Sequence, residues 1–456
     1  ITMCITGKYY KILLLFLSLS ISLYLIIVKT NLLGSDSTAY IQAANSLLEF
    51  NVFSSMGDPQ SPDNFRTAGY PMVIALAMSI SPSFYVEMVI ILQVSLMLVM
   101  ALKFISFDKF FKIRYTPIVF LPFMLHPEII NLSTSLQTEF MYVFTLFLFF
   151  IYTLKYVESG NNIDLILSAL LLSFSLHIKP VYLFFVIVYL VFVFFLDRNF
   201  RSFFIALIVI TITLSPWIVR NSTVLDTYSF TSSKNFNLLS YAYSITKEKY
   251  NLSSTQAVQK VDNLLVDRYK LKTDESILSL VSSQDNELIN KIIPMAAKDI
   301  IFNNIEYFPK VYVKGLLRGF YLPHTIYNVD KDNSLHITNL IDSVKKGEWA
   351  LVFTDKNKLD YKVLYFHFFP LILNFIALIG LLLFSTLWIV KKQFRTYQTS
   401  FILLFVWYGV LVAFPWSNNS RYMMAYFPQM AIMFLYSLNF INDKNRIKLE
   451  KGKYIP

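Results

Sequence analysis

Long apolar runs separated by short polar connections dominate the chain. A helix needs about 20 residues to cross the ~30 Å hydrocarbon core of a bilayer. Eight windows approach that length: 12–28, 84–102, 139–154, 180–196, 202–218, 368–390, 400–415 and 422–441. Two shorter runs, 116–126 and 163–177, are expected to span with help from neighbouring helices. The pattern therefore predicts an all-α polytopic membrane protein with about ten transmembrane helices.

The first exterior loop, 29–83, carries a different pattern. Apolar residues recur at three- and four-residue spacing between Ala39 and Leu48, which predicts a short amphipathic helix lying against the membrane. The apolar segment 72–80 is too short to span a bilayer. We expect it to dip into the membrane interface.

A long polar stretch follows the seventh apolar run. It is too long to be a bare loop, and its segments 254–270 and 293–320 have the apolar spacing of helices. We expect a mostly helical exterior domain, part of which, 311–322, rests on the bilayer surface. The chain then divides into three parts. These are an N-terminal transmembrane module at 1–220, the exterior domain at 221–366, and C-terminal helices with a basic cytoplasmic tail at 367–456.

Composition agrees with this architecture. Hydrophobic residues make up 55% of the chain and charged residues only 15%, against roughly 25% charged residues in soluble domains. The single cysteine, Cys4, excludes an internal disulfide framework and a thiolate cluster. The first apolar run has a basic flank but no small-residue cleavage site, so we expect it to stay as the first span.

The placement of charge predicts the orientation. Seventeen of the 40 Lys and Arg residues fall in one set of short connections and only five in the opposite set, while eighteen lie in the long exterior stretch beside sixteen Asp and Glu. Short loops rich in Lys and Arg face the cytoplasm. We therefore expect both termini in the cytoplasm, in what we take to be a bacterial inner membrane. The net charge of +11 then reflects orientation and not a nucleic-acid partner.

Several charged residues fall on the exterior side in distinctive local patterns. They are Asp36, Arg66, Glu128, Glu139, Lys179, Arg220 and Arg421. Each has a simple structural explanation. Asp36 can lie in the first turn of a helix capped by Ser35, and Glu139 can do the same behind Thr138. The basic residues can anchor in lipid phosphates.

Taken together, these residues suit one kind of chemistry. Charges at membrane depth are costly and usually face a bundle interior or a watery cavity. A carboxylate can take the proton of an acceptor hydroxyl, and cations can stabilise charge on a departing phosphate. The set is typical of sugar transfer from a phosphate leaving group on the exterior face.

The order of the motifs resembles a known family. "GSDSTAY", "RTAGYP", "TEF", "KP", "PWIVRN" and "SRY" occur in this order, and they resemble motifs of the bacterial GT-C glycosyltransferases. That group includes the protein mannosyltransferase-like enzymes and the aminoarabinose transferases of lipid A. The resemblance covers about 30–220 and 400–440. It implies a polyprenyl-phosphate-linked sugar donor, a glycan, lipid or protein acceptor, and inversion at the anomeric carbon.

The same resemblance implies roles for individual residues. Asp36 matches the catalytic base, and Glu139 matches an acid that assists the acceptor or a divalent metal. The residues that match substrate- or phosphate-binding positions are Arg66, Tyr70, Lys179, Arg220, Arg421 and Tyr422. Thr67 and Ala68 stand where the family often has prolines. Ser37 stands where it often has a second acid, and no cofactor other than such a metal is implied.

Two other functions fit the same architecture. An O-antigen-type polymerase or ligase is also polytopic with a large exterior loop, and it would use a pyrophosphate-linked glycan. A flippase or transporter for lipid-linked sugars usually shows internal repeats or interrupted helices. The sequence shows no repeat, which favours the glycosyltransferase.

Overall fold

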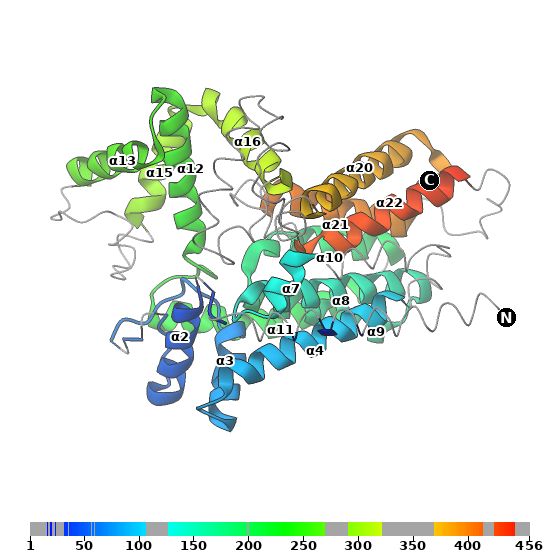
Figure 1. Ribbon diagram of the computed structural model, residues 1–456, viewed down its shortest axis with the longest axis horizontal. Coiled ribbons are helices and arrows are strands. Elements are labelled where there is room, and N and C mark those ends of the chain that lie inside the picture. The colour runs from blue at the N-terminus through cyan, green and yellow to red at the C-terminus, as the bar shows by residue number, and fades with distance from the viewer. Residues whose placement is uncertain are drawn as a thin grey trace, which may run out of the picture. The chain divides into compact units, whose positions relative to one another are not determined.

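The structure is a computed structural model of the chain (Figure 1). It describes residues 36–105 apart from 56 and 59, then 126–197, 200–269, 291–321, 369–413 and 424–442, and a few positions before residue 35. Among the described residues the regular elements are helices. In addition, Leu33 and Leu136 form one isolated parallel β-bridge. The all-α class is confirmed for this part of the chain.

Four of the described helices are long and apolar enough to cross a membrane. They are α4 (Tyr85–Ile105), α8 (Thr138–Ser159), α11 (Phe200–Val224) and α20 (Phe369–Val390). Five shorter apolar helices are α3 (Gly69–Ile80), α9 (Asn162–Ile178), α10 (Phe185–Asp197), α21 (Tyr397–Ala413) and α22 (Phe427–Asn442). The runs 12–28 and 116–126 lie almost wholly outside the described residues, so the number of ten spans stays a prediction.

The chain divides into two compact units. The first comprises Ile1–Gly34, Ile90–Phe147 and Arg318–Pro456. Within it α20 packs along α22, and a Cβ added at Gly380 would lie 2.6 Å from Cβ of Phe434. Such close helix packing needs a residue without a side chain.

A short helix, α7 (Pro127–Ser133), precedes α8 in the first unit. His126 caps α7, because its Nδ1 accepts a hydrogen bond of 3.2 Å from the backbone N–H of Glu128. The segment 127–138, which contains α7 and the first residue of α8, is fully buried. Gln93 of α4 donates to the carbonyls of Ser133 and Ser135 and so satisfies two buried backbone groups there.

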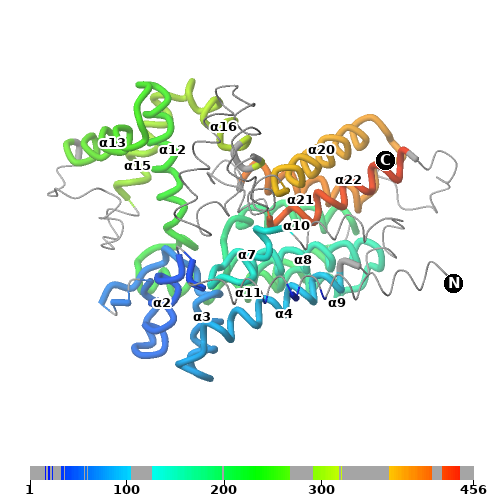
Figure 2. Tube along the Cα trace, viewed as in Figure 1, coloured from blue at the N-terminus to red at the C-terminus, as the bar shows by residue number. Residues whose placement is uncertain are grey.

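The second unit comprises Ser35–Val89 and Leu148–Leu317. Its first helix, α2 (Ser37–Phe50), packs against α3, and α3 also contacts α9. The apolar helices α9 and α10 both pack against α11 (Figure 2). The amphipathic helix expected in the first loop is thus present, with Tyr40, Ala43 and Ala44 on its buried face.

The polar part of the second unit is also helical. It contains α12 (Ser233–Tyr250), α13 (Ser254–Tyr269), α15 (Ile293–Phe302), the 3-10 turn η3 (Ile305–Tyr307) and α16 (Phe308–Tyr321). Leu239, Val261, Leu265, Ile293 and Ala296 form a buried apolar cluster between α12, α13 and α15. The helices predicted at 254–270 and 293–320 are confirmed, except that η3 interrupts the second one.

Candidate active site

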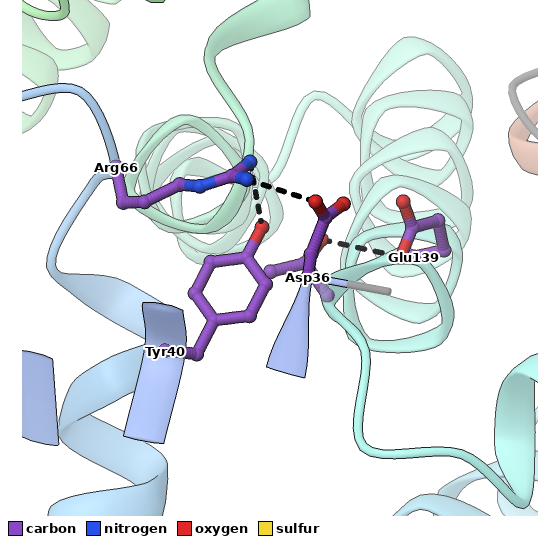
Figure 3. A network of polar contacts seen from close by, with 5 residues as sticks. Asp36, Tyr40, Arg66 and Glu139 are labelled. Carbon is purple, nitrogen blue, oxygen red and sulfur yellow. Dashed lines mark hydrogen bonds and ion pairs between the residues drawn. The ribbon is translucent and has the colours of Figure 1, made fainter. Parts of the chain in front are cut away.

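An ion pair between Asp36 and Arg66 lies at the start of α2. Oδ1 of Asp36 is 2.9 Å from Nη2 of Arg66, and the two side chains are 24% and 25% exposed (Figure 3). Asp36 occupies the N-cap position of α2, yet its side chain makes no capping hydrogen bond. The carboxylate pairs with Arg66 instead, and Asp36 stands at the N-cap and not in the first turn of the helix, where the sequence placed it.

Aromatic rings hold the Arg66 guanidinium in place. Its Cζ lies 5.1 Å from the ring centroids of both Tyr40 and Phe65, which is a cation–π distance. Nη1 also donates to the Tyr40 hydroxyl at 3.4 Å (Figure 3). The ring of Tyr70 packs edge-on against Tyr40 with centroids 5.3 Å apart. Tyr70 is fully buried, so in this structure its ring supports Tyr40.

The loop that carries Arg66 is organised by Asp63, a residue that the sequence analysis did not single out. Its Oδ2 accepts from the backbone N–H and the hydroxyl of Ser55, at 2.6 and 2.9 Å, and its Oδ1 accepts from the N–H of Phe65 at 2.8 Å. The last contact is an Asx turn, in which an Asp side chain binds the backbone two residues on. The Pro-Asp-Asn sequence at 62–64 is the signal that could have predicted this turn.

The "RTAGYP" segment lies against the "HIKP" end of α9. The hydroxyl of Thr67 donates to the carbonyl of Ile178 at 3.1 Å, and a Cβ added at Gly69 would lie 2.7 Å from the backbone of His177. Lys179 ends α9 in an extended conformation, as expected for a residue before a proline. Two motifs that are about a hundred residues apart are thereby brought together within the second unit.

The "PWIVRN" motif also reaches this loop. Arg220 near the end of α11 donates from Nη1 to the carbonyl of Asp63 at 2.8 Å and from Nη2 to the carbonyl of Phe53 at 3.0 Å. Its guanidinium lies 5.1 Å from the ring centroid of Trp217. The structure therefore places Arg220 on the backbone of the loop that carries Arg66.

Glu139 belongs to the first unit and stands at the start of α8. Its side chain is 4% exposed, and Thr138 Oγ1 lies 3.3 Å from its Oε2. Glu128 is likewise buried, at 1% exposure. Arg421 and Tyr422 lie outside the described residues.

The family resemblance allows a divalent metal at the site without requiring one. In the part of the chain that the structure describes, no three His, Cys, Asp or Glu side chains are grouped so that they could hold a metal ion. The carboxylate of Asp36 is paired with a cation, which is not the donor set that a divalent metal requires. The residues described do not fit a metal, and no reaction step is assigned to one.

Comparison with known proteins gives a distant likeness to a solved structure. No known protein family matches the sequence, and no curated protein matches it. Among solved structures, the chain is similar to the crystal structure of ArnT from Cupriavidus metallidurans in the apo state. The match covers 92% of this chain and 76% of that chain, with 9% sequence identity and a TM-score of 0.36. So distant a likeness says nothing about activity, which must be inferred from the residues themselves.

Proposed function

We propose that the protein is a membrane glycosyltransferase. It moves a sugar from a polyprenyl-phosphate-linked donor to an acceptor hydroxyl on the exterior face of the membrane. The observation that carries the proposal is the partly exposed Asp36–Arg66 pair, which combines a carboxylate and a cation at one accessible place. A carboxylate and a cation are the two kinds of group that this reaction needs.

The proposed reaction is a single displacement. Asp36 accepts the proton of the acceptor hydroxyl as the oxygen forms a bond to the anomeric carbon. The bond between that carbon and the phosphate oxygen breaks on the opposite side, so the configuration inverts and polyprenyl phosphate leaves. Arg66 orients the Asp36 carboxylate before the reaction, since their contact is direct.

Four of the remaining candidates are given proposed roles in addition to this pair. Lys179, Arg421 and Tyr422 are proposed to bind the donor phosphate, because a cation offsets the charge that develops on it. Glu139 is proposed to assist the acceptor. The acceptor itself is a glycan, a lipid or a protein, and the bilayer supplies the donor.

The decisive experiment compares Asp36→Asn with the wild type in proteoliposomes. The probes are polyprenyl-phosphate sugars with radiolabelled hexoses or pentoses, and transfer to envelope extracts is measured. We expect Asp36→Asn to lower the transfer rate about 10²–10⁴-fold, the usual contribution of a general base. Asp58→Asn is the matched control, because Asp58 is an exposed carboxylate of the same loop. Undiminished transfer by Asp36→Asn would remove Asp36 from the mechanism.

The same vesicles separate the competing functions. Turnover with a monophosphate donor supports the proposal, whereas turnover only with a pyrophosphate-linked oligosaccharide would show a polymerase or ligase. Movement of the lipid-linked sugar across the bilayer without glycosyl transfer would show a transporter.

A further inference from the structure

The backbone on both sides of Arg66 is tied to other parts of the second unit. Three consecutive carbonyls precede it, and each accepts a hydrogen bond. The donors are Nη1 of Arg220 to Asp63, at 2.8 Å, the N–H of Ser232 to Asn64, at 3.2 Å, and the hydroxyl of Thr231 to Phe65, at 3.1 Å. On the other side of Arg66, Thr67 is bonded to the end of α9. Arg66 is thus held at the centre of a fixed segment.

The partners of this segment form a continuous network at the end of α11. Asn221 is fully buried, and its Nδ2 donates to the carbonyl of Ser229 at 2.9 Å. Nε1 of Trp217 donates to the carbonyl of Phe230 at 2.8 Å. These contacts fix the 229–232 segment, which in turn supplies the Thr231 and Ser232 donors. The "PWIVRN" motif therefore acts on the first exterior loop both directly and through 229–232.

The contacts of Arg220 are those of a structural guanidinium. Both of its terminal nitrogens donate to backbone carbonyls of the loop, and one face of the group lies over Trp217. A phosphate could bind these nitrogens only by displacing the carbonyls, and a partly buried carbonyl without a donor is costly. The planar fork of arginine suits two such bonds at fixed geometry, which a lysine cannot make.

We propose that Arg220 and Thr231 are positioning residues that hold the Arg66 loop so that Arg66 meets Asp36. For its consequence in catalysis this proposal rests on the glycosyltransferase function. Its structural part does not, because it concerns the order of the loop itself. Arg220 then acts through Arg66 and does not bind the donor phosphate.

Hydrogen–deuterium exchange of the full-length protein in nanodiscs tests the structural part without any substrate. The reporter is the peptide 53–67, whose amides at Ser55, Asp63 and Phe65 are hydrogen-bonded within the loop. We expect these amides to exchange roughly tenfold faster in Arg220→Gln and roughly fivefold faster in Thr231→Val. The same amides should exchange as fast in Arg220→Lys as in Arg220→Gln. Lysine keeps the positive charge, but it cannot donate to both carbonyls at once.

Matched controls keep the result specific. Thr223→Val removes an exposed hydroxyl of α11 that bonds only its own helix in the contacts described, to Val219 and Arg220. Arg201→Gln removes an exposed arginine at the other end of α11. Both should leave the exchange of 53–67 unchanged. Unaltered exchange in Arg220→Gln and Thr231→Val would overturn the proposal, whether or not the protein transfers sugar.

A kinetic cycle then tests the link to catalysis. If Arg220 acts through Arg66, the single variant Arg220→Gln should have a lower kcat than the wild type. The double variant with Arg66→Lys should have a kcat only slightly lower than that of Arg66→Lys alone. The proposal would be overturned if the fold-losses in kcat of the two single variants multiplied in the double variant. It would also be overturned if Arg220→Gln raised the donor KM without changing kcat, since Arg220 would then contact the substrate.

Discussion

At the scale of single residues, Asp36 and Arg66 are two charged residues that the fold brings into direct contact. Each residue alone has an ordinary explanation, a helix cap for the acid and a lipid anchor for the base. The structure shows instead a direct pair at 2.9 Å, with the Tyr40 and Phe65 rings beside the guanidinium. A partly exposed ion pair contributes only about 0–1 kcal/mol to stability. The pair therefore adds little to the stability of the fold, and we propose that its geometry serves the transfer reaction instead.

The aromatic support of Arg66 leads to a prediction on activity. Tyr40→Phe keeps the ring and loses only a long hydrogen bond of 3.4 Å, so transfer should fall less than about threefold. Tyr40→Leu removes the cation–π contact and the ring against which Tyr70 packs. It should lower the transfer rate about tenfold or more, because misplaced catalytic groups are costly. Steady-state transfer assays measure both variants, and equal losses would show that the hydroxyl and not the ring matters.

Replacing Arg66 by lysine tests the geometry of the cation. Lysine keeps the charge but lacks the planar fork that reaches Asp36 and lies over the rings. We expect Arg66→Lys to lower kcat about tenfold to a hundredfold while the protein remains folded. Size-exclusion chromatography in detergent checks the folding. Full activity in Arg66→Lys would mean that a positive charge alone suffices.

At the scale of elements, close contacts between helix ends position the loops of the second unit. The first turn of α3 lies against the end of α9, where a Cβ at Gly69 would meet the backbone of His177 at 2.7 Å. A backbone neighbour cannot turn aside as a flexible side chain can. Gly69 therefore fixes the distance between the "RTAGYP" and "HIKP" motifs.

Gly69→Ala should consequently destabilise the protein. We expect a loss of about 1–3 kcal/mol, the usual cost of overpacking, seen as a lower midpoint of thermal unfolding in detergent. Met72→Ala is the control, because Met72 lies on the same helix and is 57% exposed. An unchanged midpoint in Gly69→Ala would mean that α3 and α9 can separate freely.

A second contact between elements is sensitive to pH. Glu248 of α12 pairs with Lys310 and Lys314 of α16, the latter at 2.6 Å, and these two lysines hold the pKa of Glu248 below its ordinary value of 4.5. Because the folded-state pKa is lowered, the contact stabilises the folded protein at pH values above the ordinary pKa of Glu248. That contribution is lost as the pH falls through the folded value. Because the lysines are largely exposed, the contribution is about 0.5 kcal/mol.

Amide exchange of α16 at two pH values measures this contribution. At pH 7, Glu248→Gln should exchange roughly twofold faster than the wild type in this helix. At an acidic pH below the folded-state pKa of Glu248 the two proteins should exchange alike, because the carboxyl group is then protonated. Glu306→Gln, which alters an exposed carboxylate of η3, is the control. A difference that persists once the carboxyl group is protonated would assign the effect to packing and not to charge.

At the scale of the whole molecule, orientation is the property that the function needs most. The donor and acceptor are proposed to meet on the exterior face, and the distribution of Lys and Arg predicts that the long stretch 221–366 lies there. The limits of the three parts of the chain also depend on this topology and stay predictions. The single cysteine makes the topology easy to test.

Cysteine labelling in intact cells tests the orientation. In a Cys4→Ser background, Ser244→Cys on α12 should react with a membrane-impermeant maleimide added outside. Ser159→Cys at the end of α8 should react only after permeabilisation. Both serines are exposed in the structure, so the two variants are matched. The reverse pattern would invert the predicted topology and move the site to the cytoplasm.

Much of the fold could be predicted because it is local. In a bilayer every backbone polar group must be satisfied within its own helix, so an apolar run such as 202–218 indicates a helix without further information, and α11 contains it. The helices α13 and α16 follow in the same way from apolar spacing. The break at η3 was not predicted, because the spacing continues across it.

The candidate site could be predicted from the sequence only in part. The sequence by itself determined the membrane class, the helices and the identity of the charged residues, because hydropathy and helical spacing are set by near neighbours along the chain. Only the tertiary structure decided that Asp36 pairs with Arg66, 30 residues away, and that Arg220 holds the carbonyl of Asp63, 157 residues away. Those contacts depend on how α2, α3 and α11 pack, and packing between distant segments leaves no periodic signal in the sequence.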